Sequence, residues 1–389
     1  MTKHRQIGMV GCAHYAPRQH ESRSLEEAQY LLVRNVLADA GLTIEDIDGI
    51  VVASCDQLDG RAISIMAASG SVGGVGRDIQ STPSCAEHAF ALAHLRIRSG
   101  QFRTQLILSW SPLETDSISE AQRLGADPYF HRPLPLDDWS AHALQASALE
   151  SSVPGLRDTA VAITSQNRRN AALAYPEHAS GLEEPKLIEQ SPLLRWPLRH
   201  GMVSQPAFGA VAMILASEDF IAERKLNNPA WIQGVGWATE AGFLGDRKLD
   251  ELDSLRAAAR QAYAQAGVEQ PAQAFDLAEV SDATPYQQLL GLEGLGLCAR
   301  DQWNARVSAG DFAADGKTPV NLSGGAQTFN PVYCAGLLRI AEAGNQIRGR
   351  AGAHQRPDVK RTVGHGASGF AMQYNTVVVF GKDRQEATQ

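Results

Sequence analysis

Short apolar runs alternate with longer amphipathic segments along most of this chain. The runs 7–11 and 207–216 are apolar enough to predict buried strands. Between them, residues 86–97 predict a helix with one buried face, because apolar side chains recur there at helical spacing. These side chains are Ala86, Ala89, Phe90, Ala93 and Ile97. The alternation predicts an α/β fold in which helices cover a mostly parallel or mixed sheet.

The same order of elements recurs in the second half of the chain. The similar pairs are residues 7–13 and 232–238, 37–42 and 263–268, 47–52 and 275–280, and 93–97 and 336–340. In the second pair, Gly41 and Gly267 stand where a helix C-cap is predicted. Each pair alone is weak, but four pairs in one order favour an internal duplication over coincidence.

A segment of different composition separates the two halves. Residues 116–200 contain runs rich in proline, histidine and arginine, which predicts an inserted cap. We therefore expect a first half formed by 1–115 together with 201–225, the cap at 116–200, and a second half at 226–389. Cap aromatics that could line an acceptor pocket, or equally form the core of the cap, are Tyr129, Phe130, Trp139 and Trp196.

Composition and charge exclude several classes of function. The chain has 389 residues, 20% charged and 44% hydrophobic, as is typical of a globular protein. Its net charge of −8 argues against an overall basic field for nucleic acid or an anionic membrane. The five cysteines are widely spaced without a C-x-x-C pair, so we expect neither a disulfide framework nor a metal site. Without a signal-type or membrane-spanning apolar run, we expect a cytoplasmic protein.

Cys85 is the strongest candidate for chemistry. It stands where the polar segment 81–84 meets the helix predicted at 86–97. Unpaired backbone N–H groups and the positive end of the helix dipole favour a thiolate at such a position. The same N–H groups could receive an oxyanion. A free cysteine is also commonly a small buried apolar residue, and position alone leaves the two interpretations level.

Histidines and carboxylates near these segments are weaker candidates. His365 is flanked by glycines and could shuttle protons for a cysteine. His88 follows Cys85 by one helical turn and could stabilise a thiolate, although a partly buried position on the helix face is more common. Glu87 and Asp282 have no evident partner, which predicts solvated or capping roles.

Taken together, these segments resemble the thiolase superfamily, in particular its thiolase-like branch related to sterol-carrier-protein-type thiolases. The similar blocks, in the family's order, are residues 84–101, 167–173, 208–218, 276–283, 321–325 and 365–369. The resemblance spans nearly the whole chain. It implies a duplicated five-layered α-β-α-β-α fold with an inserted cap, and a homodimer. In the family, a cysteine at the position of Cys85 carries an acyl group from a coenzyme A thioester.

The chain departs from the family's pattern among the residues that handle protons. Ser281 stands where the family has His or Asn, Asn330 replaces the histidine of Gly-His-Pro, and His365 stands near the second cysteine. Asn330 can donate a hydrogen bond but cannot act as a general base. The resemblance implies that the N–H of Cys85 and the backbone at Ala367 form an oxyanion hole. His365 would then manage protons, while Asn330 and Ser281 polarise a second carbonyl.

The preferred interpretation is a thiolase-like acyltransferase of lipid or secondary metabolism. It would form an acyl-thioester on Cys85 and transfer the acyl group in C–C bond formation or cleavage. An alternative is retro-aldol cleavage of a β-hydroxyacyl-CoA, with Tyr286, Tyr333 or Tyr374 as acid or base. A third possibility is a non-catalytic scaffold or lipid-binding subunit.

The resemblance also bears on cofactors and partners. It implies no covalently bound cofactor, and a substrate that is a coenzyme A thioester or the phosphopantetheine of an acyl carrier protein. The cap looks short and has no dense basic patch for the phosphates of the coenzyme. We therefore expect the acyl donor to arrive on a partner, either an acyl carrier protein or the small zinc-ribbon/OB-fold subunit that accompanies this branch.

Overall fold

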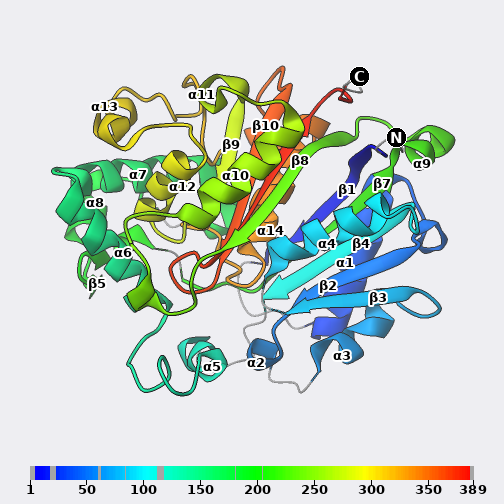
Figure 1. The fold of residues 1–389 in the computed structure, drawn as a ribbon, viewed down its shortest axis with the longest axis horizontal. Coiled ribbons are helices and arrows are strands. Elements are labelled where there is room, and N and C mark those ends of the chain that lie inside the picture. Colours follow the sequence, from blue (N-terminus) through cyan, green and yellow to red (C-terminus); the bar gives the residue numbers. More distant parts are fainter. Residues whose placement is uncertain are drawn as a thin grey trace.

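The computed structural model describes residues 5–17, 23–59, 63–83, 85–111, 118–179, 181–203 and 205–385. Nine described strands form one sheet in the order β3-β2-β4-β7-β1-β8-β11-β10-β9 (Figure 1). Their bounds are β1 Ile7–Tyr15, β2 Gly49–Ser54, β3 Asp78–Pro83, β4 Thr104–Ser111, β7 Gly209–Ser217, β8 Ala230–Thr239, β9 Leu277–Val280, β10 Arg361–Ser368 and β11 Tyr374–Gly381. β5 (Leu193–Arg195) and β6 (Leu198–Arg199) form a separate hairpin.

The α-helices lie on both faces of this sheet and in the segment between β4 and β7. Their bounds are α1 Leu25–Ala40, α2 Asp56–Asp59, α3 Ser64–Ser71, α4 Ala86–Arg98, α5 Ile118–Gly125, α6 Asp138–Ser152, α7 Leu156–Ala174, α8 Pro185–Gln190, α9 Glu218–Arg224, α10 Asp253–Ala266, α11 Pro271–Ala274, α12 Pro285–Gly294, α13 Trp303–Ser308 and α14 Ala335–Arg348. Among the described helices, none is long and apolar enough to cross a membrane.

The sheet consists of two halves with the same topology. In the first half β3, β2 and β4 are parallel, and β7 and β1 continue the sheet antiparallel. In the second half β9 and β10 are parallel, and β11 and β8 continue antiparallel. Val320 bridges Ala278 of β9 at the position that β3 takes in the first half. The duplication predicted from the sequence is therefore confirmed.

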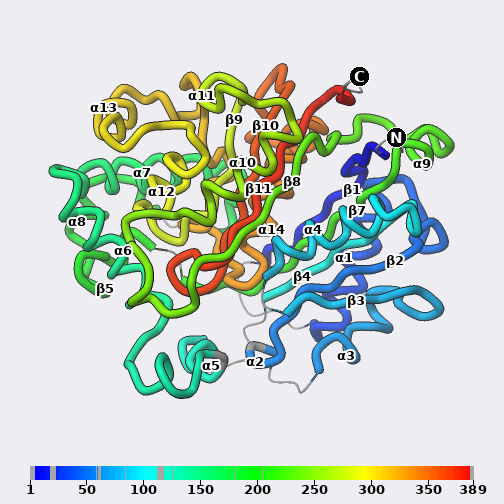
Figure 2. The backbone as a smooth tube through the Cα atoms, in the orientation of Figure 1, coloured from blue at the N-terminus to red at the C-terminus, as the bar shows by residue number. Residues whose placement is uncertain are grey.

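The halves join where β1 meets β8, through the pairs Gly8 with Trp231 and Met9 with Ala230. Figure 2 shows β8 and β11 side by side along the middle of the molecule, as their pairing requires. The corresponding helices α1 and α10 end as predicted, because their C-caps Gly41 and Gly267 have φ of 67° and 63°. A left-handed cap of this kind favours glycine.

The layers follow from which helices contact which strands. α4 packs against β2 and β4, α14 packs against β9 and β10, and the two helices contact each other between the halves of the sheet. α1 covers β1 and β7, and α10 covers β8 and β11. Every residue of α14 from Gly336 to Arg348 is buried, as expected for a helix enclosed on all sides. The expected five-layered α-β-α-β-α fold is therefore confirmed.

The segment between β4 and β7 carries α5 to α8 and the β5–β6 hairpin. Within it, α6 and α7 pack against α12, and α7 also packs against α13. These contacts place the segment beside the second half of the sheet, although it interrupts the first half in sequence. We keep residues 116–200 as the proposed cap.

Candidate functional site

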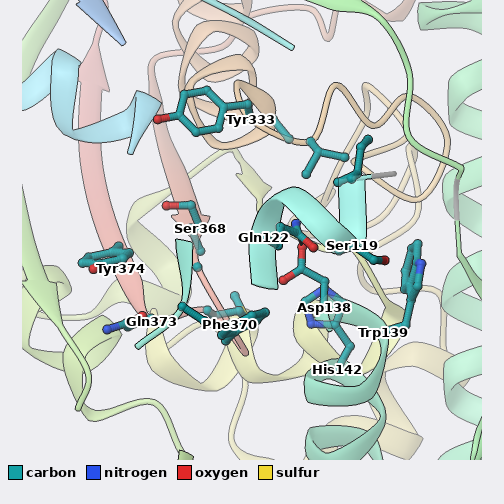
Figure 3. A pocket seen from close by; sticks show the side chains of 18 of the residues that line it. Ser119, Gln122, Asp138, Trp139, His142, Tyr333, Ser368, Phe370, Gln373 and Tyr374 are labelled. Atoms are coloured by element: carbon teal, nitrogen blue, oxygen red, sulfur yellow. Dashed lines mark hydrogen bonds between the residues drawn. The ribbon is translucent and has the colours of Figure 1, made fainter. Parts of the chain in front are cut away.

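A cavity of about 620 Å³ lies between the cap and the layer that contains α14. It is lined by α5 and α6 from the cap, and by the loops that precede α12, α14 and β11. Ser368 and Tyr374 lie on one side in Figure 3, with Asp138, Trp139 and His142 facing them. The described lining residues include no lysine or arginine. The cavity can therefore hold an uncharged, partly apolar group.

Cys85 is the N-cap residue of α4, with φ −132° and ψ 90°. The predicted place at the start of a helix is thus correct. Only 4% of the residue is exposed, and Ser368, which lines the cavity, lies within hydrogen-bonding reach of the thiol. Burial and the negative charge of Glu87 raise the pKa of Cys85, and the hydrogen bond with Ser368 lowers it by less. The thiol is therefore the stable form at neutral pH, contrary to the thiolate that the helix start alone favours.

Glu87 is a feature of this site that sequence reasoning missed. It was expected to be solvated or capping, but it is fully buried between α4, α14 and β10. Ser368 Oγ donates to Glu87 Oε1 at 2.6 Å. Burial raises the pKa of Glu87 to about 7, although the Ser368 hydrogen bond opposes this. The pattern of apolar residues in one helix does not predict the burial of Glu87, because it does not show that α4 lies between two layers of strands.

Ser281, Ala367 and Asn330 all reach the cavity wall. The Ala367 N–H donates to Ser281 Oγ at 2.8 Å, and Ser281 Oγ donates to the His365 carbonyl oxygen at 3.2 Å. An oxyanion at Ala367 would therefore compete with the Ser281 hydroxyl. Asn330 is 6% exposed, and its carbonyl oxygen accepts from the Ala207 N–H at 2.9 Å. This backbone hydrogen bond fixes the position of Asn330 at the cavity wall.

His365 lies on the face of β10 opposite Ser368, because side chains alternate along a strand. A Cβ added to Gly366 would lie 2.8 Å from the Gly336 oxygen of α14, so the even-numbered positions face α14. His365 instead points toward α12, and its Nε2 donates to Asn375 Oδ1 at 2.9 Å. Burial lowers its pKa to about 4. The structure therefore does not bring His365 to Cys85, and we leave it out of the proposed proton-handling set.

Tyr286 and His88 also have other partners. The Tyr286 hydroxyl donates to Glu150 Oε1 at 2.5 Å, and Tyr286 is absent from the described cavity lining. The His88 ring meets Tyr374 edge-on, with centroids 5.8 Å apart, and burial lowers the pKa of His88. A neutral His88 cannot stabilise a thiolate by charge. Of the tyrosines, Tyr333 and Tyr374 line the cavity.

Asp282 holds the turn that carries Asn330. Its carboxylate accepts from Asn167 Nδ2 at 2.9 Å, from Gln327 Nε2 at 2.8 Å and from the Ala326 N–H at 2.7 Å. Burial raises the pKa of Asp282 to about 7. The three bonds tie the cap helix α7 and the turn before α14 to one carboxylate. Asp282 therefore positions the cavity wall, whereas a solvated or capping role was expected.

The cap supplies the facing wall. Phe130 and Trp139 line the cavity, whereas Trp196 and Tyr129 are outside its described lining and are 64% and 81% exposed. Gln287 Nε2 lies 3.0 Å from His142 Nδ1, and burial lowers the pKa of His142 to about 4. This wall is therefore aromatic and carries a neutral imidazole.

Comparisons with known proteins agree with this fold. Residues 243–382 match the model of a family described as thiolase C-terminal domain-like. Sterol carrier protein 2 of Oryctolagus cuniculus is 33% identical over 164 residues, which cover 40% of this chain and 29% of that protein. Acetyl-CoA acetyltransferase of Methanothermobacter thermautotrophicus is 31% identical over 170 residues, or 43% of this chain and 44% of that protein.

A solved structure is similar over almost its full length. The Ltp2-ChsH2(DUF35) aldolase superimposes with a TM-score of 0.81 at 20% identity, covering 98% of both chains. At this identity the likeness establishes the fold. The segments that match curated relatives are shorter, and the match to sterol carrier protein 2 spans less than a third of that protein.

Proposed function

Since this chain belongs to the thiolase superfamily, we propose that it is a thiolase-like enzyme that carries an acyl group on Cys85. The acyl group is then transferred in C–C bond formation or cleavage. The observation that carries the proposal is the place of Cys85, at the start of α4 and behind the cavity-lining Ser368. Covalent catalysis at such a thiol replaces one difficult step by two easier ones.

The chemistry can be assigned to groups around the cavity. The Cys85 sulfur attacks the carbonyl carbon of an acyl thioester, the C–S bond of the donor breaks, and the donor leaves as a thiolate that takes a proton from solvent. The α4 N-terminus favours the negative charge that develops on the carbonyl oxygen. Asn330 donates a hydrogen bond to the carbonyl of the second substrate, and Ser281 fixes the neighbouring backbone through Ala367.

We further propose that a partner presents the acyl donor. Coenzyme A carries phosphates that proteins bind mainly through arginine, lysine and helix N-termini. The described cavity lining instead includes the acidic residues Asp127, Asp138 and Asp282 and no lysine or arginine. An acyl carrier protein, or a small zinc-ribbon/OB-fold subunit, would supply the missing contacts, and a DUF35 protein is named with the similar aldolase. The homodimer remains part of this proposal.

Retro-aldol cleavage of a β-hydroxyacyl thioester is the second candidate. It is favoured by Tyr333 and Tyr374, which line the cavity and can exchange protons with a substrate hydroxyl. The similar solved structure is named as an aldolase. In this mechanism Cys85 is not acylated. The raised pKa of its thiol is then no obstacle.

Product analysis of matched variants separates the two candidates. We expect wild-type protein, with a carrier or accessory partner present, to transfer acyl groups from acyl thioesters, and Cys85→Ser to lose this activity while Tyr374→Phe retains it. Cleavage of a β-hydroxyacyl thioester that survives Cys85→Ser and is lost in Tyr374→Phe would contradict acyl transfer and support retro-aldol cleavage. If the protein shows neither activity with any partner, the scaffold interpretation remains.

A further inference from the structure

Cys85, Ser368 and Glu87 form a continuous row of polar groups beside the cavity. Ser368 Oγ donates to Glu87 Oε1 at 2.6 Å, and the Cys85 thiol lies within hydrogen-bonding reach of Ser368. We propose that Ser368 and Glu87 are the proton relay that deprotonates Cys85 during acylation and returns the proton during deacylation. This inference rests on the proposed function and names the groups that activate its nucleophile.

The direction of the relay follows from the donors available. A serine hydroxyl has one proton and two lone pairs. While that proton lies toward Glu87, Ser368 Oγ has a lone pair that can take the proton of the thiol. Once Cys85 is ionised, the Ser368 hydroxyl can turn and donate to the thiolate, which is the interaction that lowers the pKa of Cys85. The proposed path of the proton therefore runs from Cys85 Sγ through Ser368 Oγ to Glu87 Oε1, and the sense of the Ser368–Glu87 bond points toward the carboxylate.

Two glycines leave the space in the core that this carboxylate occupies. A Cβ on Gly336 of α14 would lie 2.7 Å from Glu87 Oε2, and one on Gly366 of β10 would lie 2.6 Å from Glu87 Cβ. Glu87 Oε2 is buried and has no hydrogen-bond partner in the described part of the chain. Burying an ionised carboxylate without compensation is costly. Its presence here is explained if the group gains and loses a proton.

Among the residues that the structure describes, no lysine or arginine forms an ion pair or hydrogen bond with Glu87. Of the titratable groups on the neighbouring elements, Cys85 at the start of α4 feels the charge of Glu87, while Tyr374 on β11 contacts His88 of α4 and interacts with Cys85. β10 contributes Ser368, and α14 contributes Gly336. Burial alone dominates and raises the pKa of Glu87 to about 7. A base with a pKa close to the operating pH transfers protons efficiently in both directions.

The relay accounts for the Cys85 proton in both half-reactions, acylation and deacylation. In acylation, the Cys85 S–H proton passes to Ser368 Oγ and the Ser368 proton passes to Glu87 Oε1, while an S–C bond forms to the thioester carbonyl carbon. The C–S bond of the donor breaks, and the donor thiolate takes a proton from solvent. In deacylation, the acceptor loses its C–H proton to solvent, a C–C bond forms to the acyl carbon as its bond to Cys85 Sγ breaks, and the proton on Glu87 returns through Ser368 to Cys85 Sγ.

The pH dependence of alkylation tests the coupling between Glu87 and Cys85 without any substrate. Iodoacetamide labelling of Cys85, measured by peptide mass, should rise about tenfold per pH unit up to about pH 7 and then level off. It levels off because each ionised Glu87 opposes the neighbouring thiolate. In Glu87→Gln the rise should continue through pH 9. Wild-type and Glu87→Gln profiles of the same shape would overturn the relay.

Acylation by a small activated thioester, S-phenyl thioacetate, tests the relay itself. Single-turnover acylation should fall by about 10²–10⁴ in Ser368→Ala and in Glu87→Gln, the range of general-base effects. Ser368→Thr keeps the hydroxyl and should recover most of the rate. Asp253→Asn, at an exposed first-turn carboxylate of α10, is the matched control and should leave the rate unchanged.

The outcomes distinguish the relay from the proposed function. If wild-type Cys85 forms no acyl adduct, the proposed function fails and the relay with it. If Cys85 is acylated at equal rates in wild type, Ser368→Ala and Glu87→Gln, the relay alone is overturned. If Glu87→Gln does not fold, the pair Ser368→Ala and Ser368→Thr decides, because equal rates in these two would also contradict the relay.

Discussion

Cys85 is surrounded by groups that keep its proton in place until a substrate arrives. Burial and the charge of Glu87 raise the pKa of the thiol, and the Ser368 hydrogen bond offsets only part of this. A nucleophile in these surroundings must be activated during the reaction. The sequence predicts where Cys85 lies but not its neighbours, because Ser368 is 281 residues away from Glu87 in the chain.

His365 shows how a sequence pattern can mislead at this scale. Flanking glycines predicted an accessible ring, but those glycines make room for α14 on one face of β10, while His365 is enclosed on the other. Whether a strand residue faces a site depends on the register of the sheet. A single sequence does not fix that register, because both faces of this strand are buried.

Acid stability should report the burial of His365. The unfolded residue titrates near pH 6.5, and burial lowers its pKa to about 4 in the folded state. Between these values the unfolded chain binds a proton that the folded chain does not. Stability should therefore fall as the pH drops from about 6.5 to about 4, by about 3 kcal/mol for this residue.

The comparison of wild type with His365→Gln isolates this contribution, because other buried histidines titrate equally in both proteins. The free energy of unfolding, measured with urea from pH 7 to pH 4, should fall more steeply in wild type than in the variant. Parallel pH profiles would show that His365 is not held neutral.

At the scale of elements, α4 and α14 are counterparts in the duplicated fold. Each begins at a cysteine, because Cys85 is the N-cap residue of α4 and Cys334 that of α14. Only Cys85 has Ser368 and Glu87 beside it, whereas the fully buried Cys334 donates to the Gly209 carbonyl oxygen at 3.7 Å. The two halves thus have similar helix starts, and of their two cysteines Cys85 is the one with these polar neighbours.

The helices and their ends were the most predictable elements. Gly41 and Gly267 mark helix ends because a left-handed C-cap selects glycine locally. The burial of Glu87 was not predictable in the same way. It depends on Gly336 and Gly366, which are distant from Glu87 in the sequence. Their lack of a side chain leaves space for Glu87 only when α14 and β10 are packed together.

Substitution of Gly366 tests this packing. A Cβ there would lie 2.6 Å from Glu87 Cβ and 2.8 Å from the Gly336 oxygen, so Gly366→Ala must push β10 and α14 apart. We expect a loss of about 1–3 kcal/mol in the free energy of unfolding, measured with urea. Gly70→Ala in α3 is the control, since a Cβ at Gly70 meets nothing within 4 Å. A Gly366→Ala protein as stable as this control would contradict the packing.

At the scale of the whole molecule, the duplicated fold forms the cavity from the proposed cap and the second half, together with Cys55, Gln57 and Pro206 of the first half. The resemblance to thiolases predicted this architecture because their sequence blocks keep their order. The composition of the cavity wall was harder to predict from the sequence, since the wall combines residues between 55 and 374. The lack of lysine and arginine in its described lining could be seen only in the folded structure.

Donor preference tests what that lining implies. With no Lys or Arg in the described lining, the free chain should use an acyl-coenzyme A and the matching acyl-N-acetylcysteamine, which lacks the phosphates, with rates that agree within about tenfold. The measurement is single-turnover acylation at low ionic strength. A preference of more than about 100-fold for the coenzyme A thioester would show that this chain binds the phosphates itself.

The central claim is that Cys85 carries the acyl group, and localised mass spectrometry tests it most directly. Wild type, Cys85→Ala and the counterpart Cys334→Ala are each incubated with an acyl thioester, quenched and mapped by peptide mass. The account predicts an acyl adduct on the peptide containing Cys85 in wild type and in Cys334→Ala, and none in Cys85→Ala. Turnover of the thioester that persists in Cys85→Ala, with no adduct on Cys85 in wild type, would contradict it.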